Sequence, residues 1–188
     1  MSKIGKKNIA IPKESSIKIE GCDLTITGPK GTKKLTINDK IFSSKLNDND
    51  FQLLPLQKKI DKKTSIMWGT YRSLVNNAVM GVSKGHEKIL ELNGVGFRAN
   101  LKGELLNLQI GFSHDINFKI PKDVKITVEK QTVIKINGVD KELVSKIAAD
   151  IKNLKPVEPY KGKGIKERGQ FILRKEGKKK WWKKLIQK

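Results

Sequence analysis

The sequence predicts an α+β protein with two duplicated domains, each a small antiparallel (mixed) β-sheet packed against one helix, and a basic C-terminal tail. Two observations carry this prediction: strand-like alternation twice gives way to helix-like spacing, and charge concentrates at the end of the chain. Residues 161–188 hold twelve Lys or Arg against two Glu, which is +10 of the formal +21. We place the domains at 1–84 and 85–160 and the tail at 161–188. A chain of 188 residues, 37% hydrophobic, can form two modest cores.

The first domain begins with a predicted hairpin. Ile17 and Ile19, and then Leu24 and Ile26, alternate with polar residues on either side of a turn at 21–23. Glycine, proline and asparagine mark the later turns of this domain. Further short strands are expected at 33–37, 40–46 and 51–54, separated by a turn at 28–31 and a polar loop at 47–50.

An amphipathic helix is expected over 64–83. Its apolar residues recur three and four positions apart, which is the spacing of one helix face. Thr64 or Ser65 is the candidate N-cap, because a hydroxyl there can accept a bond from a free backbone N–H of the first turn. The residues assigned to the apolar face are Ile66, Trp68, Tyr71, Val75, Val79 and Val82.

The second domain repeats part of the first. The segment 11–14 (Ile-Pro-Lys-Glu) resembles 120–123 (Ile-Pro-Lys-Asp), and the apolar alternation after each segment is similar. The repeat again ends in a helix, at 141–154, with Asp140 as candidate N-cap and Pro156 as the stop. Other strands are expected at 88–92, 97–101, 105–110 and 116–120.

One glycine motif in this domain has a second interpretation. Residues 94–99 (Gly-Val-Gly-Phe-Arg-Ala) formally match the dinucleotide-binding fingerprint, in which a helix must come after the glycines. The next segment has a further apolar strand pattern instead. We therefore expect a sharp bend, with Phe97 packed and Arg98 exposed.

Several kinds of site lack the residues that they require. Cys22 is the single cysteine, which excludes an internal disulfide and a multi-cysteine metal site, and it is expected to be a free thiol beside a turn. His86 and His114 are the only histidines, and neither has a second ligand at helical spacing. We predict no catalytic residue, metal, cofactor or small-molecule substrate. No apolar run reaches the length of a membrane span, and the start lacks the apolar core of a secretory signal.

The charge points to a polyanionic partner. Of the forty basic residues only four are arginines, so distributed phosphate contacts are favoured over bidentate reading of base edges. Aromatic rings at Tyr160, Phe171, Trp181 and Trp182 lie among the cations of the C-terminal segment, a composition suited to stacking on bases while neutralising phosphates. A general architectural nucleic-acid-binding protein and an anionic membrane surface remain alternatives, as does a merely solubilising tail.

Four segments carry a family resemblance. They are 157–165 (Val-Glu-Pro-Tyr-Lys-Gly-Lys-Gly-Ile), 92–99, 108–114 and 174–180. In their order along the chain and in their spacing, these segments resemble the ribosomal protein L6 family of the large subunit. The resemblance implies a non-enzymatic structural protein of two duplicated α+β domains. It further implies binding to large-subunit rRNA near the sarcin-ricin loop and stalk base, beside other ribosomal proteins and where translation factors dock.

The resemblance also implies which residues meet rRNA. The segment after the second helix supplies Lys155, Tyr160, Lys161, Gly162, Lys163, Gly164, Lys166 and Arg168. A more general electrostatic contact is implied for Arg174, Lys175, Lys178, Lys179 and Lys180. Arg98, Trp181 and Trp182 are candidates for either an rRNA or a protein contact.

Two segments depart from the family pattern. Residues 181–188 extend past its usual lysine-rich end, and 47–63 match it weakly. The Lys, Ile and Asn bias suits an AT-rich bacterial or a mitochondrially encoded gene. The ending at 174–180 resembles alphaproteobacterial and mitochondrial members of the family, which favours an organelle-encoded protein of the mitochondrial ribosome, with the bacterial cytoplasm as the alternative.

Overall fold

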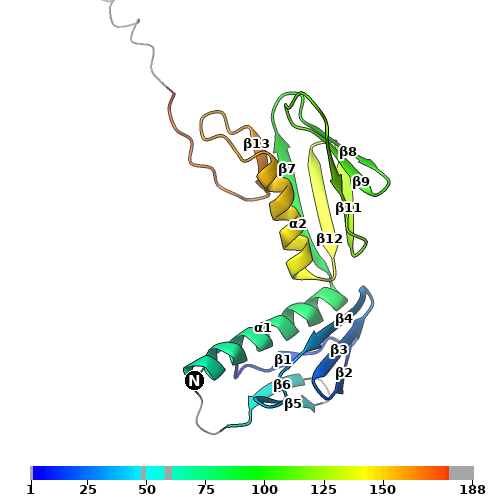
Figure 1. The fold of residues 1–188 in the computed structure, drawn as a ribbon, viewed down its shortest axis with the longest axis vertical. Helices are drawn as coiled ribbons and strands as arrows, with labels where there is room; N and C mark the ends of the chain where they lie inside the picture. The colour runs from blue at the N-terminus through cyan, green and yellow to red at the C-terminus, as the bar shows by residue number, and fades with distance from the viewer. Residues whose placement is uncertain (1, 48–49, 58–60, 178–188) are drawn as a thin grey trace, which may run out of the picture. The chain divides into compact units, whose positions relative to one another are not determined.

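A computed structural model describes residues 2–47, 50–57 and 61–177, which form two compact units (Figure 1). The first unit comprises 1–87 together with 137–144, and the second comprises 88–136 together with 145–188. The boundary predicted from the sequence is 84/85. Residues 137–144, from the middle of the predicted second domain, group with the first unit.

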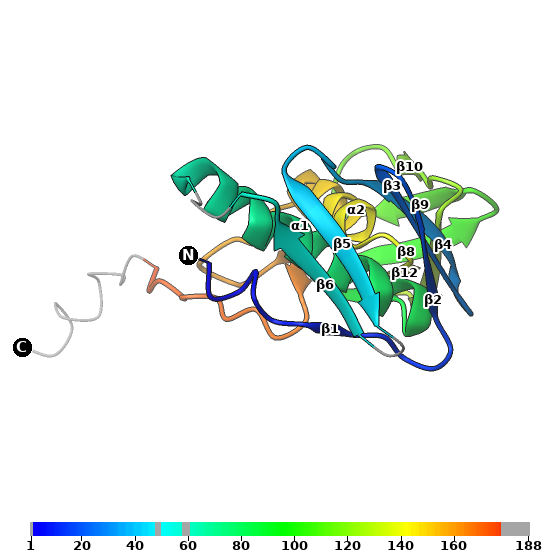
Figure 2. The ribbon, with the colours of Figure 1, turned by 90° about the horizontal axis from the view of Figure 1, so that it is seen from below.

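The first unit contains two antiparallel three-stranded sheets. Their orders are β2-β3-β4 and β1-β6-β5, and Figure 2 shows β5 and β6 side by side. The strands are β1 (Ile9–Ala10), β2 (Ser16–Glu20), β3 (Asp23–Gly28), β4 (Gly31–Thr36), β5 (Phe42–Asn47) and β6 (Asp50–Pro55). The predicted hairpin is confirmed, since Ile17 lies opposite Ile26 and Ile19 opposite Leu24. The two-residue β1 was not predicted, because so short a segment has no periodicity.

The helix α1 (Lys62–Ser83) covers the first unit's core. Trp68 is 3% exposed, and its indole N–H donates to the backbone oxygen of Leu53 at 2.7 Å. Val75, Val79 and Val82 are also buried, as predicted.

Two details of the predicted helix were wrong. The helix starts earlier, with Asp61 as N-cap and no side-chain capping bond, so Thr64 and Ser65 lie inside its first turn. Ile66 is 62% exposed, because two residues turn a helix by about 200°, which places Ile66 nearly opposite the buried Trp68.

The second unit contains a three-stranded and a four-stranded sheet, in the orders β10-β9-β8 and β11-β12-β7-β13. The helix α2 (Lys141–Leu154) runs alongside β7 and β12 (Figure 1). Asp140 caps this helix as predicted, accepting a bond from the backbone N–H of Glu142 at 3.1 Å. The strands are β7 (His86–Asn93), β8 (Arg98–Lys102), β9 (Leu105–Gln109), β10 (Ile116–Lys119), β11 (Val124–Glu129), β12 (Val133–Gly138) and β13 (Gly164–Glu167).

The internal repeat is confirmed as a repeated pair of strands. Leu24 and Ile26 of β3 and their counterparts Ile134 and Ile136 of β12 are at most 1% exposed. The copies differ in the elements between the second strand of the pair and the helix. Strands β4 to β6 separate β3 from α1, whereas α2 begins three residues after β12 ends.

The glycine segment 94–97 turns the chain between β7 and β8. Gly96 has φ +78°, and a Cβ on Gly94 would lie 3.0 Å from the Phe97 ring. Phe97 is buried and Arg98 exposed, as predicted. A strand comes after these glycines rather than a helix, so the dinucleotide-binding geometry is absent from this segment.

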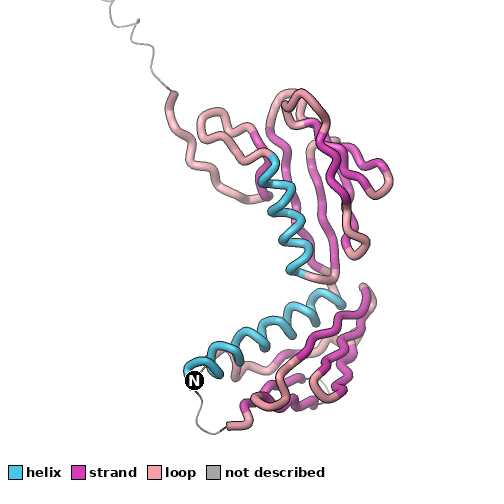
Figure 3. Tube along the Cα trace, viewed as in Figure 1, coloured by secondary structure: helices cyan, strands magenta, loops and turns pink. Residues whose placement is uncertain are grey.

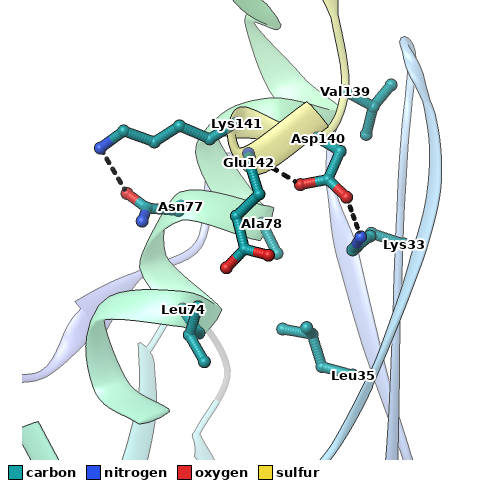
Figure 4. Close-up of a pocket in the computed structure, with 9 residues that line it drawn as sticks. All are labelled: Lys33, Leu35, Leu74, Asn77, Ala78, Val139, Asp140, Lys141 and Glu142. Atoms are coloured by element: carbon teal, nitrogen blue, oxygen red, sulfur yellow. Dashed lines mark hydrogen bonds and ion pairs between the residues drawn. The ribbon is translucent and has the colours of Figure 1, made fainter. Parts of the chain in front are cut away.

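A small pocket in the first unit lies between α1, β4 and the residues at the start of α2 (Figure 4). Leu35, Leu74 and Ala78 provide apolar walls. The polar residues at its rim are partnered within the pocket, because Lys33 pairs with Asp140 and Lys141 donates to the side-chain oxygen of Asn77 at 3.3 Å. These contacts leave the pocket few free polar groups for a ligand.

Candidate nucleic-acid interface

The strand β13 lies inside the segment that the sequence assigned to the tail. It pairs antiparallel with β7, with Gly164 opposite Asn93 and Ile165 opposite Leu92. Ile165 is fully buried. Residues 164–167 of the basic segment are therefore part of the second unit's sheet.

The loop 155–163 connects α2 to β13 (Figure 3). Backbone hydrogen bonds hold this loop. The Ile165 N–H donates to the Lys155 oxygen at 2.9 Å, the Glu158 N–H to the Lys163 oxygen at 2.8 Å, and the Gly162 N–H to the Glu158 oxygen at 3.0 Å. These bonds fix the path of the backbone, and with it the positions from which the side chains extend.

Two glycines give this loop its shape. Gly162 has φ +69° and Gly164 has φ +137°, conformations that residues with a Cβ rarely adopt. A Cβ on Gly164 would also lie 2.7 Å from the Pro156 oxygen. Both glycines are also buried. Their backbone conformations explain why glycine occupies each position.

The basic residues of the loop gather with residues from farther along the chain. Tyr160, Lys161 and Lys163 are exposed. The Lys175 N–H donates to the Pro159 oxygen at 3.0 Å, and the Arg174 guanidinium lies 3.5 Å from where a Cβ on Gly162 would be. We call this set the loop patch: Lys155, Tyr160, Lys161, Lys163, Arg174 and Lys175. Within the described part of the chain, none of its five cations forms an ion pair.

Lys166 and Arg168 are placed differently. The ammonium of Lys166 lies 2.9 Å from one carboxylate oxygen of Glu91, and the Arg168 Nε lies 3.7 Å from the other. Lys166 is three-quarters buried, whereas the Arg168 side chain is 66% exposed. Glu91 thus partly neutralises two residues that the family resemblance assigned to rRNA.

Glu167 anchors the other face of β13. Its carboxylate accepts from Lys152 of α2 and from Lys88 of β7, each at 3.0 Å. The hydrogen bond from Lys152 and then that from Lys88 hold the pKa of Glu167 below its ordinary value of 4.5. The pair of bonds ties the edge strand to the helix and to the neighbouring strand.

Glu167→Gln should lower the free energy of unfolding near neutral pH by about 0.5–1 kcal/mol, because partly exposed ion pairs contribute a few tenths each. A carboxylate whose pKa is lower in the folded than in the unfolded protein stabilises the fold at pH values above the unfolded pKa. This stabilisation is lost as the pH falls through the folded pKa. In urea titrations the gap between variant and wild type should therefore close below pH 4.5. Glu158→Gln is the control, since that exposed carboxylate forms no ion pair among the described residues. A gap that persists in acid would contradict the assignment.

Two further loops lie near the loop patch. Residues 94–97 come after β7, at the point where Asn93 pairs with Gly164. A Cβ on Gly111 would lie 3.2 Å from the Phe97 ring, which brings the loop 110–115 to the same end of the unit. The Lys155 Nζ lies 4.6 Å from the centre of the Phe112 ring. The sequence places Phe112 within a family motif but predicts no role for it, since nothing in the local pattern shows that it meets Lys155.

The structure shows no contact between the loop patch and the remaining predicted rRNA-binding residues that it describes. Arg98 is exposed at the start of β8, opposite Gln109. Lys178, Lys179, Lys180, Trp181 and Trp182 lie outside the described residues. Glu91, which engages Lys166 and Arg168, was missed because only the β7–β13 pairing brings it close.

The described residues also bear on metals and membranes. No group of three or more His, Cys, Asp or Glu among them is placed to hold a metal ion. No helix in this part of the chain combines the length and apolar character that crossing a bilayer requires. Cys22 is an exposed free thiol, as expected.

Comparison with known proteins agrees with the duplicated fold. The model of the family described as Ribosomal protein L6 matches residues 11–85 and again 93–168. The large ribosomal subunit protein uL6 of Phenylobacterium zucineum is 44% identical over 180 residues, covering 96% of this chain and 100% of that protein. The uL6 proteins of Beijerinckia indica and Staphylococcus carnosus are 47% and 46% identical, covering 96% and 95% of this chain and 100% and 98% of their own lengths.

Proposed function

Because the chain belongs to the ribosomal protein L6 family, we propose that it is a structural, non-enzymatic constituent of the large ribosomal subunit that binds large-subunit rRNA. Its relatives carry the name of a large-subunit protein and match it over nearly its whole length. Its RNA contact is distributed phosphate neutralisation on a folded surface.

The loop patch is the observation that carries this proposal. An exposed tyrosine and three cations lie on a loop whose backbone is held by its own hydrogen bonds, and Arg174 and Lys175 lie beside that loop. None of these five cations has an ion-pair partner in the described chain. Because the backbone of this loop is already ordered, the entropy lost on meeting phosphates comes mainly from the side chains. Gly162 and Gly164 contribute to RNA binding by shaping the loop. Lys166 and Arg168 contribute positive charge on and next to β13, where the carboxylate of Glu91 partly neutralises them.

The family resemblance suggests where this contact lies. We place the loop patch against rRNA near the sarcin-ricin loop and stalk base, with other large-subunit proteins alongside and translation factors docking nearby. Arg98, the lysines at 178–180 and the tryptophans at 181–182 are further candidate contacts. Hydroxyl-radical footprinting of the rRNA with and without the protein would locate the site; protection confined to other regions would refute this placement.

The compartment is a separate proposal. The resemblance of the ending at 174–180 to mitochondrial and alphaproteobacterial members favours the mitochondrial ribosome, and the bacterial cytoplasm, which the Lys, Ile and Asn bias suits equally, is the alternative. The relatives named above are bacterial. Locating the gene on an organellar or a bacterial chromosome decides between the two.

Sedimentation of cell lysate tests the proposed function. The protein should travel with the large-subunit fraction and leave it when ribonuclease destroys the RNA. In a second measurement, the logarithm of its binding constant for rRNA should fall linearly with the logarithm of salt, by about 0.7–0.9 per phosphate contact. A general architectural nucleic-acid-binding protein would instead spread over many RNA and DNA species, and that distribution would favour the alternative.

A further inference from the structure

Phe112 occupies an unusual position for a phenylalanine. It lies on the loop 110–115, and 46% of the side chain is exposed. Gly111 beside it has φ +76°, and a Cβ there would lie 3.2 Å from the buried Phe97 ring. The chain next to the exposed ring therefore packs on the core of the unit.

Two side chains flank this ring. The Lys155 Nζ lies 4.6 Å from its centre, within the range of a cation–π contact. The His114 ring lies 23° from parallel, with the centroids 6.4 Å apart. Two nearly parallel rings this far apart are offset from each other, so the His114 ring covers only part of the Phe112 ring.

Lys155 connects this ring to the loop patch. It belongs to the patch and also contacts Phe112, so an exposed aromatic face and several unpaired cations adjoin one another. An RNA nucleotide presents the complementary groups, a flat base beside a phosphate. An apolar protein surface would cover the ring but would leave the adjacent cations without counter-charges.

We propose that Phe112, flanked by Lys155 and His114, is a stacking platform for an unpaired rRNA base whose phosphate meets the loop patch. The proposal rests on the rRNA-binding function proposed above. The loop patch supplies salt-dependent affinity, whereas the platform supplies affinity for an accessible base, which is independent of charge. Base stacking on aromatic side chains is tolerant of sequence, so the platform selects an unpaired nucleotide rather than a particular base.

Phe112→Leu tests the platform in the full-length chain, with protein-free large-subunit rRNA as the probe. Leucine keeps apolar bulk but removes the π-face. The binding constant should fall about five- to a hundredfold while the slope against salt stays unchanged. Phe118→Leu on β10 is the matched control, since it removes a half-buried ring from the same unit outside the loop 110–115, and it should bind as the wild type does.

Phe112→Trp gives a second measurement that does not depend on a loss of affinity. The variant should bind at least as tightly as the wild type, and RNA should quench more emission in the variant than in the wild type, in which Trp181 and Trp182 are themselves candidate contacts. Binding of Phe112→Leu within twofold of wild type, or absence of this additional quenching, would overturn the platform and leave the proposed function intact. Absence of rRNA binding by the wild type would overturn both. Normal rRNA affinity of Phe112→Leu with lost assembly into particles would assign the ring to a protein contact instead.

Discussion

Replacing Gly164 with alanine should lower the free energy of unfolding of the second unit by about 3 kcal/mol. Two costs combine. The backbone at φ +137° is in a region nearly restricted to glycine, which costs about 1–3 kcal/mol for other residues. The new Cβ would also lie 2.7 Å from both the Pro156 oxygen and the Val157 Cα, and these backbone atoms cannot move aside without shifting the loop.

Alanine substitutions at two other glycines distinguish the cost of the backbone conformation from the cost of the steric clash. Gly169 has φ +82° with nothing within 4 Å of an added Cβ, so Gly169→Ala should show the backbone cost alone, about 1 kcal/mol. Gly177 has neither a left-handed φ nor a close neighbour, and Gly177→Ala should be nearly neutral. Urea unfolding followed by circular dichroism measures all three. If Gly164→Ala and Gly169→Ala lower the free energy of unfolding equally, the loop 155–163 shifts to accommodate the new Cβ at little cost.

Neutralising the four outer cations of the loop patch should have the largest effect on RNA binding. The variant carries glutamine at Lys161, Lys163, Arg174 and Lys175. If each contacts one phosphate, the slope of log K against log salt should flatten by about 3 and affinity near 0.1 M salt should fall about a thousandfold. Substitution is preferable to truncation at 161, since truncation would remove the buried Ile165 and all of β13.

A control with the same change in net charge makes this result specific. Lys13, Lys18, Lys34 and Lys40 are exposed lysines of the first unit and can be replaced together by glutamine. This variant should keep most of the slope. If both quadruple variants flatten it equally, binding follows total charge, and the general nucleic-acid-binding alternative gains support. Filter binding over a range of salt concentrations gives both slopes.

Local patterns were sufficient to predict most of the fold. The hairpin around Gly21, the turn at 28–31 and the helix over 141–154 each depend on residues close together in the chain. The start of α1 was misplaced because a capping hydroxyl was expected, whereas this helix begins without a side-chain cap. Only β1 and β13 were missed among the described strands, and both are short segments whose partners lie far away in sequence.

The candidate site was predicted as a list of residues but not as an arrangement. In the sequence, 161–168 is one basic run. The structure divides it, because Lys161 and Lys163 stand on an exposed loop while Lys166 and Arg168 lie beside Glu91 on a paired strand. Phe112 and Arg174 enter the same region from distant parts of the chain.

The sequence by itself determined the duplicated α+β plan, the excess of positive charge and the family, since composition, periodicity and contiguous motifs are local properties. Tertiary structure alone decided which cations are free and which are neutralised. An ion pair such as Lys166 with Glu91 depends on strand register, and β13 and β7 are separated by some seventy residues of chain. Register is set by the burial of Ile165 against Leu92 and by the left-handed glycine that begins the strand, which no single segment of the chain contains.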